Sequence, residues 1–316
     1  MRAVQAGLVE PRKFELIETD LSPGPGEVLI EIAACGICSS EIPRYTGEEM
    51  SDPPVFLGHE PSGVVVEVGG GVSEFEEGDR VTGAISAGFA THSVAPMEGL
   101  LAVPDGVDLL HAIGEPLMCI SNIARAAAPK FGDHVAVVGC GQMGLLTIAA
   151  LKQVGLGSLI AVDRIGRRLD LALQIGATHA VGADGQDPVV AVAAIAPGGA
   201  DVVVELTGKP GGLELSAELI RMGQATLVMA GFHQTRDAYY LRQFAFKGLV
   251  AHQAHPHYSP DVMADYARAL AALARGAFPM DLVVTEQFPL DRIADGFEAL
   301  ISHREGFLKG IVVPGK

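Results

Sequence analysis

The glycine-rich segment Gly139–Gly144, with the sequence GCGQMG, constrains the fold of this chain more than any other feature. It directly follows the apolar run of residues 134–138 and opens a stretch with helical spacing, which is the strand–turn–helix context that a G-x-G-x-x-G fingerprint requires. The first glycine makes the turn, the second lets the backbone approach a pyrophosphate, and the third permits close helix–strand packing. The segment predicts an α/β sheet that binds a dinucleotide, the alternative being a tight turn in a sheet that binds none.

An acidic residue lies where this fingerprint needs one to select its coenzyme. Asp163 follows Gly144 by 19 residues and ends the apolar run SLIAVD, where a carboxylate binds the adenosine ribose hydroxyls and repels a 2′-phosphate. Three arginines follow directly, and arginines at this point are alternatively a binding site for the 2′-phosphate of NADP. Because Asp163 is present, we interpret them as adenosine-stacking or solvated residues and favour NAD over NADP. The arginines are Arg164, Arg167 and Arg168. The expected cofactor-binding residues are Gly139, Gly141, Gln142, Met143, Gly144, Asp163, Arg164 and Arg168.

The rest of the chain divides into two kinds of pattern, as 316 residues would allow. From 134 to about 254, short apolar runs alternate with helical stretches, which predicts a doubly wound parallel sheet. Before residue 130, short strand-like runs such as EVLIEIAA and GVVVEV lie between turn clusters, which predicts a β-rich domain of Greek-key or barrel type. Beyond 255 a helix and a final strand-like run return.

The balance of charges and the cysteine count limit the partners and the compartment. The chain has 38 acidic and 22 basic residues, a formal net charge of −16, so neither nucleic acid nor an anionic membrane surface is an expected partner. No apolar run reaches the roughly 18 residues of a transmembrane helix, and the first residues lack a signal-peptide pattern. Four cysteines are too few for a disulfide scaffold, which favours the cytoplasm. They are Cys35, Cys38, Cys119 and Cys140.

Two short motifs in the N-terminal half carry residues that bind metals. The first is CGICSSE, residues 35–41, and the second is Gly58-His59-Glu60. Catalytic zinc takes about three protein ligands, and a cysteine thiolate with a histidine 21 residues later would supply two of them. A C-x-x-C pair is alternatively half of a structural zinc knuckle or a redox pair, but a second C-x-x-C and a thioredoxin-like context are both missing.

The chain resembles the zinc-dependent medium-chain dehydrogenase/reductase family of alcohol, sorbitol and threonine dehydrogenases. The resemblance covers nearly the whole chain, and its motifs occur in order: GICSSE, GHEPSGVVVEVG, GDRV and EPL, then the nucleotide fold and the C-terminal return. The resemblance implies an α/β protein with a GroES-like β-rich catalytic domain over 1–120 and 255–316 and a Rossmann NAD-binding domain over 121–254. It also implies an NAD-dependent, zinc-dependent alcohol or polyol dehydrogenase with a small-molecule alcohol as substrate.

The resemblance also implies a ligand set for one catalytic zinc. The family positions correspond to Cys38, His59 and, in the segment GEPL, Glu115. Glu-Pro at that point resembles the polyol dehydrogenase branch, in which the glutamate of the GHE motif, here Glu60, is a further candidate ligand. Which of Glu60 and Glu115 coordinates directly stays open, with ligand exchange between them as a further alternative.

Two further residues are expected to act in proton transfer or positioning. Ser40 matches the position whose hydroxyl contacts the substrate alcohol, and Glu41 matches the position that orients the ligand histidine. Many relatives place a relay histidine five residues after the ligand cysteine, where this chain has Pro43. The proton route from Ser40 is therefore expected to run through cofactor ribose hydroxyls and water, or through Glu60.

Other departures from the family pattern set further expectations. The segment after GDRV, TGAISAGFATHSVAP, lacks the cysteines of a structural zinc loop, so a second zinc is not expected. Cys119 and Cys140 are expected to pack as small apolar residues. The cluster HQAHPH is expected to be a polar loop rather than a metal site; its histidines are His252, His255 and His257.

The resemblance bears on assembly and on the substrate as well. The run KGLVAHQ, residues 247–253, is the expected edge strand through which family members pair, so we expect a homodimer or homotetramer. The acidic balance and the Glu-Pro pair favour a neutral polyol, sugar or cyclitol. A zinc-free quinone or enoyl reductase and a non-catalytic NAD-binding protein are the alternatives.

Overall fold

The computed structural model describes residues 1–315 except 235 and 237, and it divides into two units. Unit 1 comprises Met1–Met118, Tyr266–Gly276 and Met280–Lys316, and unit 2 comprises Cys119–Asp265 and Ala277–Pro279. The chain returns to unit 1 later than the predicted residue 255. The reason is Asp265, a fully buried carboxylate that accepts hydrogen bonds from Arg125 and Ser259, at 2.8 and 2.5 Å, and so holds the segment before it in unit 2.

Unit 1 is rich in β-structure and contains two sheets in the part that is described. A seven-stranded sheet has the order β15-β16-β3-β5-β6-β8, with β7 also paired to β3, and a three-stranded sheet has the order β2-β1-β4. The strands are β1 Arg2–Glu10, β2 Lys13–Asp20, β3 Glu27–Gly36, β4 Val55–Phe56, β5 Pro61–Val68, β6 Arg80–Gly83, β7 His92–Pro96, β8 Leu100–Ala102, β15 Val284–Phe288 and β16 Lys309–Val312.

The core of unit 1 forms around β3, which pairs with β5, β7 and β16 and is therefore buried along most of its length. Its apolar residues 28–30 have no exposed surface, as the continuous run VLI predicts. Aromatic rings complete the core, with Tyr45 stacked on Phe297 at a centroid distance of 4.5 Å. The helices with residues in this unit are α1 Ile42–Thr46, α2 Gly114–Ala127, α8 Val262–Ala274, α9 Met280–Val283 and α10 Ile293–Ile301.

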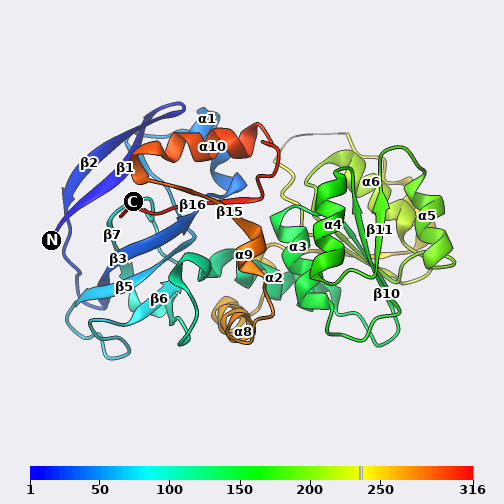
Figure 1. Cartoon of the computed structure of the whole chain (residues 1–316), viewed down its shortest axis with the longest axis horizontal. Helices are drawn as coiled ribbons and strands as arrows, with labels where there is room; N and C mark the ends of the chain where they lie inside the picture. Colours follow the sequence, from blue (N-terminus) through cyan, green and yellow to red (C-terminus); the bar gives the residue numbers. More distant parts are fainter. Residues whose placement is uncertain (235, 237, 316) are drawn as a thin grey trace. The chain divides into compact units, whose positions relative to one another are not determined.

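Unit 2 is a doubly wound α/β domain, as the alternating pattern predicts (Figure 1). Its described strands form a six-stranded parallel sheet of order β11-β10-β9-β12-β13-β14. The strands are β9 His134–Val138, β10 Ser158–Asp163, β11 His179–Gly182, β12 Val202–Glu205, β13 Thr226–Met229 and β14 Val250–Gln253. The helices wholly in this unit are α3 Gln142–Leu151, α4 Gly166–Ile175, α5 Pro188–Ile195, α6 Pro210–Leu219 and α7 Arg242–Lys247.

The strand order of unit 2 reverses between β9 and β12, and this reversal decides where a ligand binds. Right-handed crossovers place α3 and α4 on one face of the sheet and α6 and α7 on the other. Helices therefore diverge at the reversal, and the crevice at the carboxyl ends of β9 and β12 is where doubly wound sheets bind their ligands. The fingerprint Gly139–Gly144 follows β9 directly.

The predicted elements are present, with shifts at their ends. Strand β10 covers the whole predicted run SLIAVD, whereas β14 begins only at Val250, because Lys247 ends α7 and Gly248 turns the chain with a φ of +58°. Helix α3 covers the stretch with helical spacing that follows the fingerprint and ends at Leu151. No helix among the described residues has the length and apolar character needed to cross a membrane.

Candidate metal and cofactor sites

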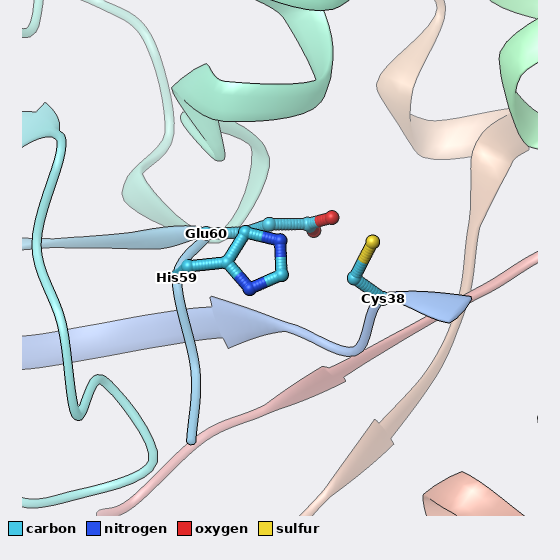
Figure 2. A group of neighbouring side chains, drawn as sticks. All are labelled: Cys38, His59 and Glu60. Atoms are coloured by element: carbon cyan, nitrogen blue, oxygen red, sulfur yellow. The ribbon is translucent and has the colours of Figure 1, made fainter. Parts of the chain in front are cut away.

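Three side chains in unit 1 converge as a metal site would require. The Cys38 sulfur, a ring nitrogen of His59 and a carboxylate oxygen of Glu60 all lie within 4.8 Å of one another, and Figure 2 shows them around a common space. Cys38 follows β3, and His59 and Glu60 directly precede β5. These strands pair antiparallel with Cys35 opposite Pro61, so the pairing register brings the two motifs together.

The donor set and its charges fit zinc. Sulfur, nitrogen and oxygen are all zinc donors, and tetrahedral bonds of 2.0–2.3 Å would place them about 3.3–3.8 Å apart, which small side-chain movements would reach from this arrangement. Burial lowers the pKa of His59, but hydrogen bonds to Cys38 and Glu41 and their negative charge outweigh burial and raise this pKa to about 11. The group thus gathers negative charge that a divalent cation would neutralise.

Glu41 contacts the Nδ1 side of the His59 ring, as the family pattern implies. Its side chain is buried, and its Oε1 accepts hydrogen bonds from the Gly58 backbone N–H at 2.7 Å and from His59 Nδ1 at 3.0 Å. In the neutral ring that would bind a metal, this contact would place the hydrogen on Nδ1 and leave Nε2 for the metal.

Ser40 contacts the Cys38–His59–Glu60 group, whereas Pro43 adds no polar side chain to it. The exposed Ser40 hydroxyl donates to the Cys38 sulfur at 3.2 Å, through the short helical turn Ser39–Glu41. Pro43 is buried in the first turn of α1 and offers no side-chain donor or titratable group.

A lysine that the sequence analysis missed completes the surroundings of Glu60. Lys309, on β16, has 2% of its surface exposed; its Nζ lies 2.5 Å from Glu60 Oε2 and donates to the Ile37 carbonyl at 2.9 Å. A Cβ on Gly36 would lie 1.9 Å from Glu60 Oε2, so only glycine allows this approach. A single lysine inside the apolar terminal run LKGIVV was the available signal.

Glu115 is one of the groups whose negative charge acts on Lys309. Burial lowers the pKa of Lys309, but Glu60, Cys38 and Glu115 outweigh it and raise that pKa. Glu115 therefore lies within electrostatic reach of the group. Of the two candidate carboxylates, Glu60 lies within 4.8 Å of both Cys38 and His59. Glu60 is next to His59 in the chain, which keeps its carboxylate close to the other two donors. Glu115 stays the alternative ligand that the resemblance implies.

Thr82 ties the turn that carries Glu115 to the segment that carries Glu60. Its buried hydroxyl donates to the Pro61 carbonyl at 2.8 Å and accepts from the Gly114 N–H at 3.1 Å. Glu115 follows Gly114 directly and is half-buried in the first turn of α2.

In unit 2 the three fingerprint glycines lie as predicted. Gly139 turns the chain with a φ of +96°, and a Cβ on Gly144 would lie 1.9 Å from the Gly139 carbonyl oxygen, so helix and strand pack in close contact. A Cβ on Gly141 would meet nothing within 4 Å, which is the room a pyrophosphate needs. The neighbouring Gln142 has a buried side-chain nitrogen without a hydrogen-bond partner, and Met143 is half-buried.

The carboxylate of Asp163 is held at the carboxyl end of β10 next to this turn. It is 8% exposed and accepts hydrogen bonds from the Cys140 N–H at 2.6 Å and the Ile165 N–H at 2.8 Å. Arg164 is exposed and paired with Asp184 at 3.1 Å, and Arg168 is half-exposed. The carboxylate that would bind the ribose is thus fixed by the backbone, and Arg164 has another partner.

The remaining predicted residues lie outside both sites. His252 is on β14 rather than in a loop, and it shares a hydrogen bond with Tyr258, while His255 is exposed and the His257 side chain lies outside the described residues. Neither His252 nor His255 joins a metal-binding group among the residues described. Cys140 is buried, which raises the pKa of its thiol, and packs as predicted; Cys119 is half-buried on α2.

Comparison with known proteins gives the family of the chain. Residues 24–105 match the alcohol dehydrogenase GroES-like domain and residues 143–272 match the zinc-binding dehydrogenase domain. The chain is 29% identical to (R,R)-butanediol dehydrogenase of Bacillus subtilis (strain 168) over 89% of this chain and 90% of the relative, and 26% identical to sorbitol dehydrogenase of the same strain over 92% and 91%.

A solved structure extends the agreement to the fold. A putative zinc-binding dehydrogenase from Sinorhizobium meliloti 1021, bound to NADP, superimposes with a TM-score of 0.87 and 27% identity over 99% of this chain and 100% of that one. The two matched domains lie in the order and over the units that carry the Cys38–His59–Glu60 group and the glycine fingerprint. The chain therefore belongs to the zinc-dependent medium-chain dehydrogenase/reductase family.

Proposed function

We propose that this protein oxidises a secondary alcohol of the polyol, sugar or cyclitol class to a ketone, with transfer of a hydride to NAD and release of a proton. The observation that carries the proposal is the convergence of Cys38, His59 and Glu60 within 4.8 Å in a chain that also has a complete dinucleotide fingerprint. The butanediol and sorbitol dehydrogenases among its relatives support the substrate class. A zinc-free quinone or enoyl reductase is disfavoured because the cysteine and histidine donors are present.

The proposed mechanism assigns a separate task to each residue of unit 1. Cys38, His59 and Glu60, with Glu115 as the alternative carboxylate, would hold zinc, which when bound would supply a Lewis acid for the substrate oxygen; bound NAD would supply the hydride acceptor. Glu41 holds the His59 ring in one tautomer. Lys309 balances the charge of Glu60 and holds its carboxylate.

Proton removal begins at Ser40 in this proposal. Its hydroxyl is exposed and lies 3.2 Å from the Cys38 sulfur, so it would lie next to a substrate oxygen bound at the metal. Ser40 accepts the alcohol proton as it passes its own onward. Because Pro43 cannot titrate, Glu60 is the second acceptor that this chain offers.

A panel of alcohols, sugars and inositols tests the proposal. Each is incubated with NAD or NADP, reduced cofactor is followed by absorbance, and metal content is measured on the same sample. We expect the highest kcat/KM with a vicinal diol or cyclic polyol and NAD. A protein that binds NAD but reduces it with no member of the panel would support the non-catalytic alternative.

We expect one zinc per chain. The chain lacks the cysteines of a structural zinc loop, and Cys38, His59 and Glu60 form the one metal-binding group found among the described residues. Elemental analysis after exhaustive dialysis measures the ratio. Two tightly held zinc ions would contradict the expectation and direct attention to the HQAHPH segment.

Replacing Asp163 by glycine is expected to raise the KM for NAD by roughly 10- to 150-fold and to narrow the preference over NADP. The change removes both the ribose acceptor and the charge that repels a 2′-phosphate. Initial rates with each coenzyme measure the effect, and Asp170→Asn, on the exposed face of α4, is the control. If the unmodified protein preferred NADP, the nearby arginines rather than Asp163 would determine the coenzyme preference.

We propose a homodimer or a pair of dimers formed along β14. This strand ends the described sheet, pairs there only with β13, and is exposed at Val250 by 43%. Phe246 and Met222 add exposed apolar surface of 66% and 63% nearby in unit 2. A second copy pairing with β14 would cover an edge that otherwise promotes aggregation.

The free thiols of all four cysteines support a cytoplasmic location.

Light scattering at micromolar concentration is expected to give at least twice the mass of the chain. Val250→Lys is expected to shift the protein toward monomer, because a charge on an edge strand opposes pairing. Val190→Lys, at an equally apolar exposed position on α5, is expected to leave the mass unchanged. A monomeric unmodified protein would rule out the proposed assembly.

A further inference from the structure

A buried carboxylate, an imidazole and a phenol form a hydrogen-bonded chain in unit 2 that neither the fingerprint nor the metal site uses. Glu205, the last residue of β12, has no exposed surface, and its Oε2 lies 3.0 Å from His233 Nε2. The other ring nitrogen of His233 lies 3.1 Å from the Tyr239 hydroxyl, and the two rings pack edge to face. The chain links the carboxyl end of β12 to the segment that follows β13.

Glu205 also organises two backbone turns. Its Oε1 accepts hydrogen bonds from the N–H groups of Thr207 and Gly208, at 2.6 and 3.0 Å, and its own carbonyl accepts from the N–H groups of Ala230 and Gly231. A Cβ on Gly231 would lie 2.4 Å from the Gly208 nitrogen and 2.6 Å from Glu205 Oε2. The turns after β12 and β13 are therefore in direct contact, with the Glu205 carboxylate between them.

These turns lie where the second half of a dinucleotide must extend. The strand order reverses between β9 and β12, and Asp163 on β10 assigns the adenosine half to the β9–β11 side. Nicotinamide and its ribose would then pass over the carboxyl ends of β12 and β13. A Cβ on Gly139 would lie 3.0 Å from the Thr207 nitrogen, so the fingerprint turn and the β12 turn adjoin each other.

We infer that Glu205, His233 and Tyr239 are positioning residues for the nicotinamide half of the cofactor. His233 gives the buried carboxylate its partner on Oε2, and Tyr239 holds the imidazole ring from its other side. Without His233, Glu205 loses that partner, and the turn after β13 loses its tie to the turn after β12. The inference rests on the proposed dinucleotide binding.

Binding of AMP and NADH, each measured by isothermal titration calorimetry, separates the two halves of the site. AMP probes the adenosine half alone. We expect His233→Ala to raise the Kd for NADH roughly tenfold while the Kd for AMP changes less than about twofold. His233→Gln keeps a donor for Glu205 and is expected to restore most of the NADH affinity. Tyr239→Phe, a milder change that removes one hydroxyl, is expected to raise the NADH Kd about threefold.

His134→Ala is the matched control, because this half-buried histidine bonds to Ser158 at the opposite end of the same sheet. Equal weakening of AMP and NADH by His233→Ala would show a purely structural role and overturn the inference. Unchanged binding of both ligands in His233→Ala and Tyr239→Phe would overturn it as well. An unmodified protein that binds neither AMP nor NADH would instead refute the proposed function, and the inference with it.

Discussion

Replacing Cys38 by serine is expected to lower kcat/KM for alcohol oxidation at least roughly 10³-fold and to abolish tight zinc binding. The thiolate is the strongest donor in the Cys38–His59–Glu60 group, and a serine hydroxyl stays protonated at neutral pH. A Lewis acid contributes several kcal/mol to transition-state stabilisation, and roughly 4 kcal/mol corresponds to a factor of about 10³. Steady-state kinetics and elemental analysis on the same preparation measure both effects.

NADH binding by Cys38→Ser is expected to stay unchanged, because the fingerprint lies in unit 2 and Cys38 in unit 1. Cys119→Ser is the matched control, a half-buried cysteine on α2 outside the metal-binding group, and is expected to keep its zinc. A Cys38→Ser protein with full zinc content would remove Cys38 from the ligand set. Retention of activity after complete zinc loss would instead reject the Lewis-acid mechanism.

Replacing Ser40 by alanine is expected to slow alcohol oxidation by roughly 10²–10⁴-fold, the range for loss of an acid–base group. The hydroxyl lies 3.2 Å from the Cys38 sulfur, and Pro43 offers no substitute nearby. Zinc content should stay at the unmodified level, because Ser40 is not among the donors. The measurement is kcat with protiated and deuterated alcohol, so that an isotope effect establishes that chemistry limits the rate.

Two variants narrow the interpretation. Ser39→Ala changes the adjacent hydroxyl on the same helical turn and is expected to have little effect. Pro43→His is expected to help little, because Pro43 is buried in the first turn of α1 and a larger ring would not fit its place. Near-normal turnover by Ser40→Ala, with the isotope effect present, would mean that the proton leaves by another route, and Glu60→Gln would then be the next variant to measure.

The two domain types and most strands were predictable from local sequence patterns. The run SLIAVD became β10 without a shift, and the glycine fingerprint took the predicted turn, because a strand, a tight turn and a helix start depend on neighbouring residues. Element ends were less predictable. Strand β14 is shorter than the run KGLVAHQ because the turn at Gly248 precedes it, and Asp265 delays the return to unit 1 through contacts with Arg125 and Ser259.

The sequence by itself determined the fold class, the fingerprint residues and the pairing of Cys38 with His59, since each depends on a short motif or on its order along the chain. Only the tertiary structure decided that Glu60 lies within 4.8 Å of both and that Lys309 lies 2.5 Å from Glu60. The physical reason is strand pairing. The antiparallel register of β16 on β3 places Ile311 opposite Gly36, which brings a lysine from the end of the chain beside a motif near its start. Contacts of this range depend on how all the intervening elements pack, so no local pattern encodes them.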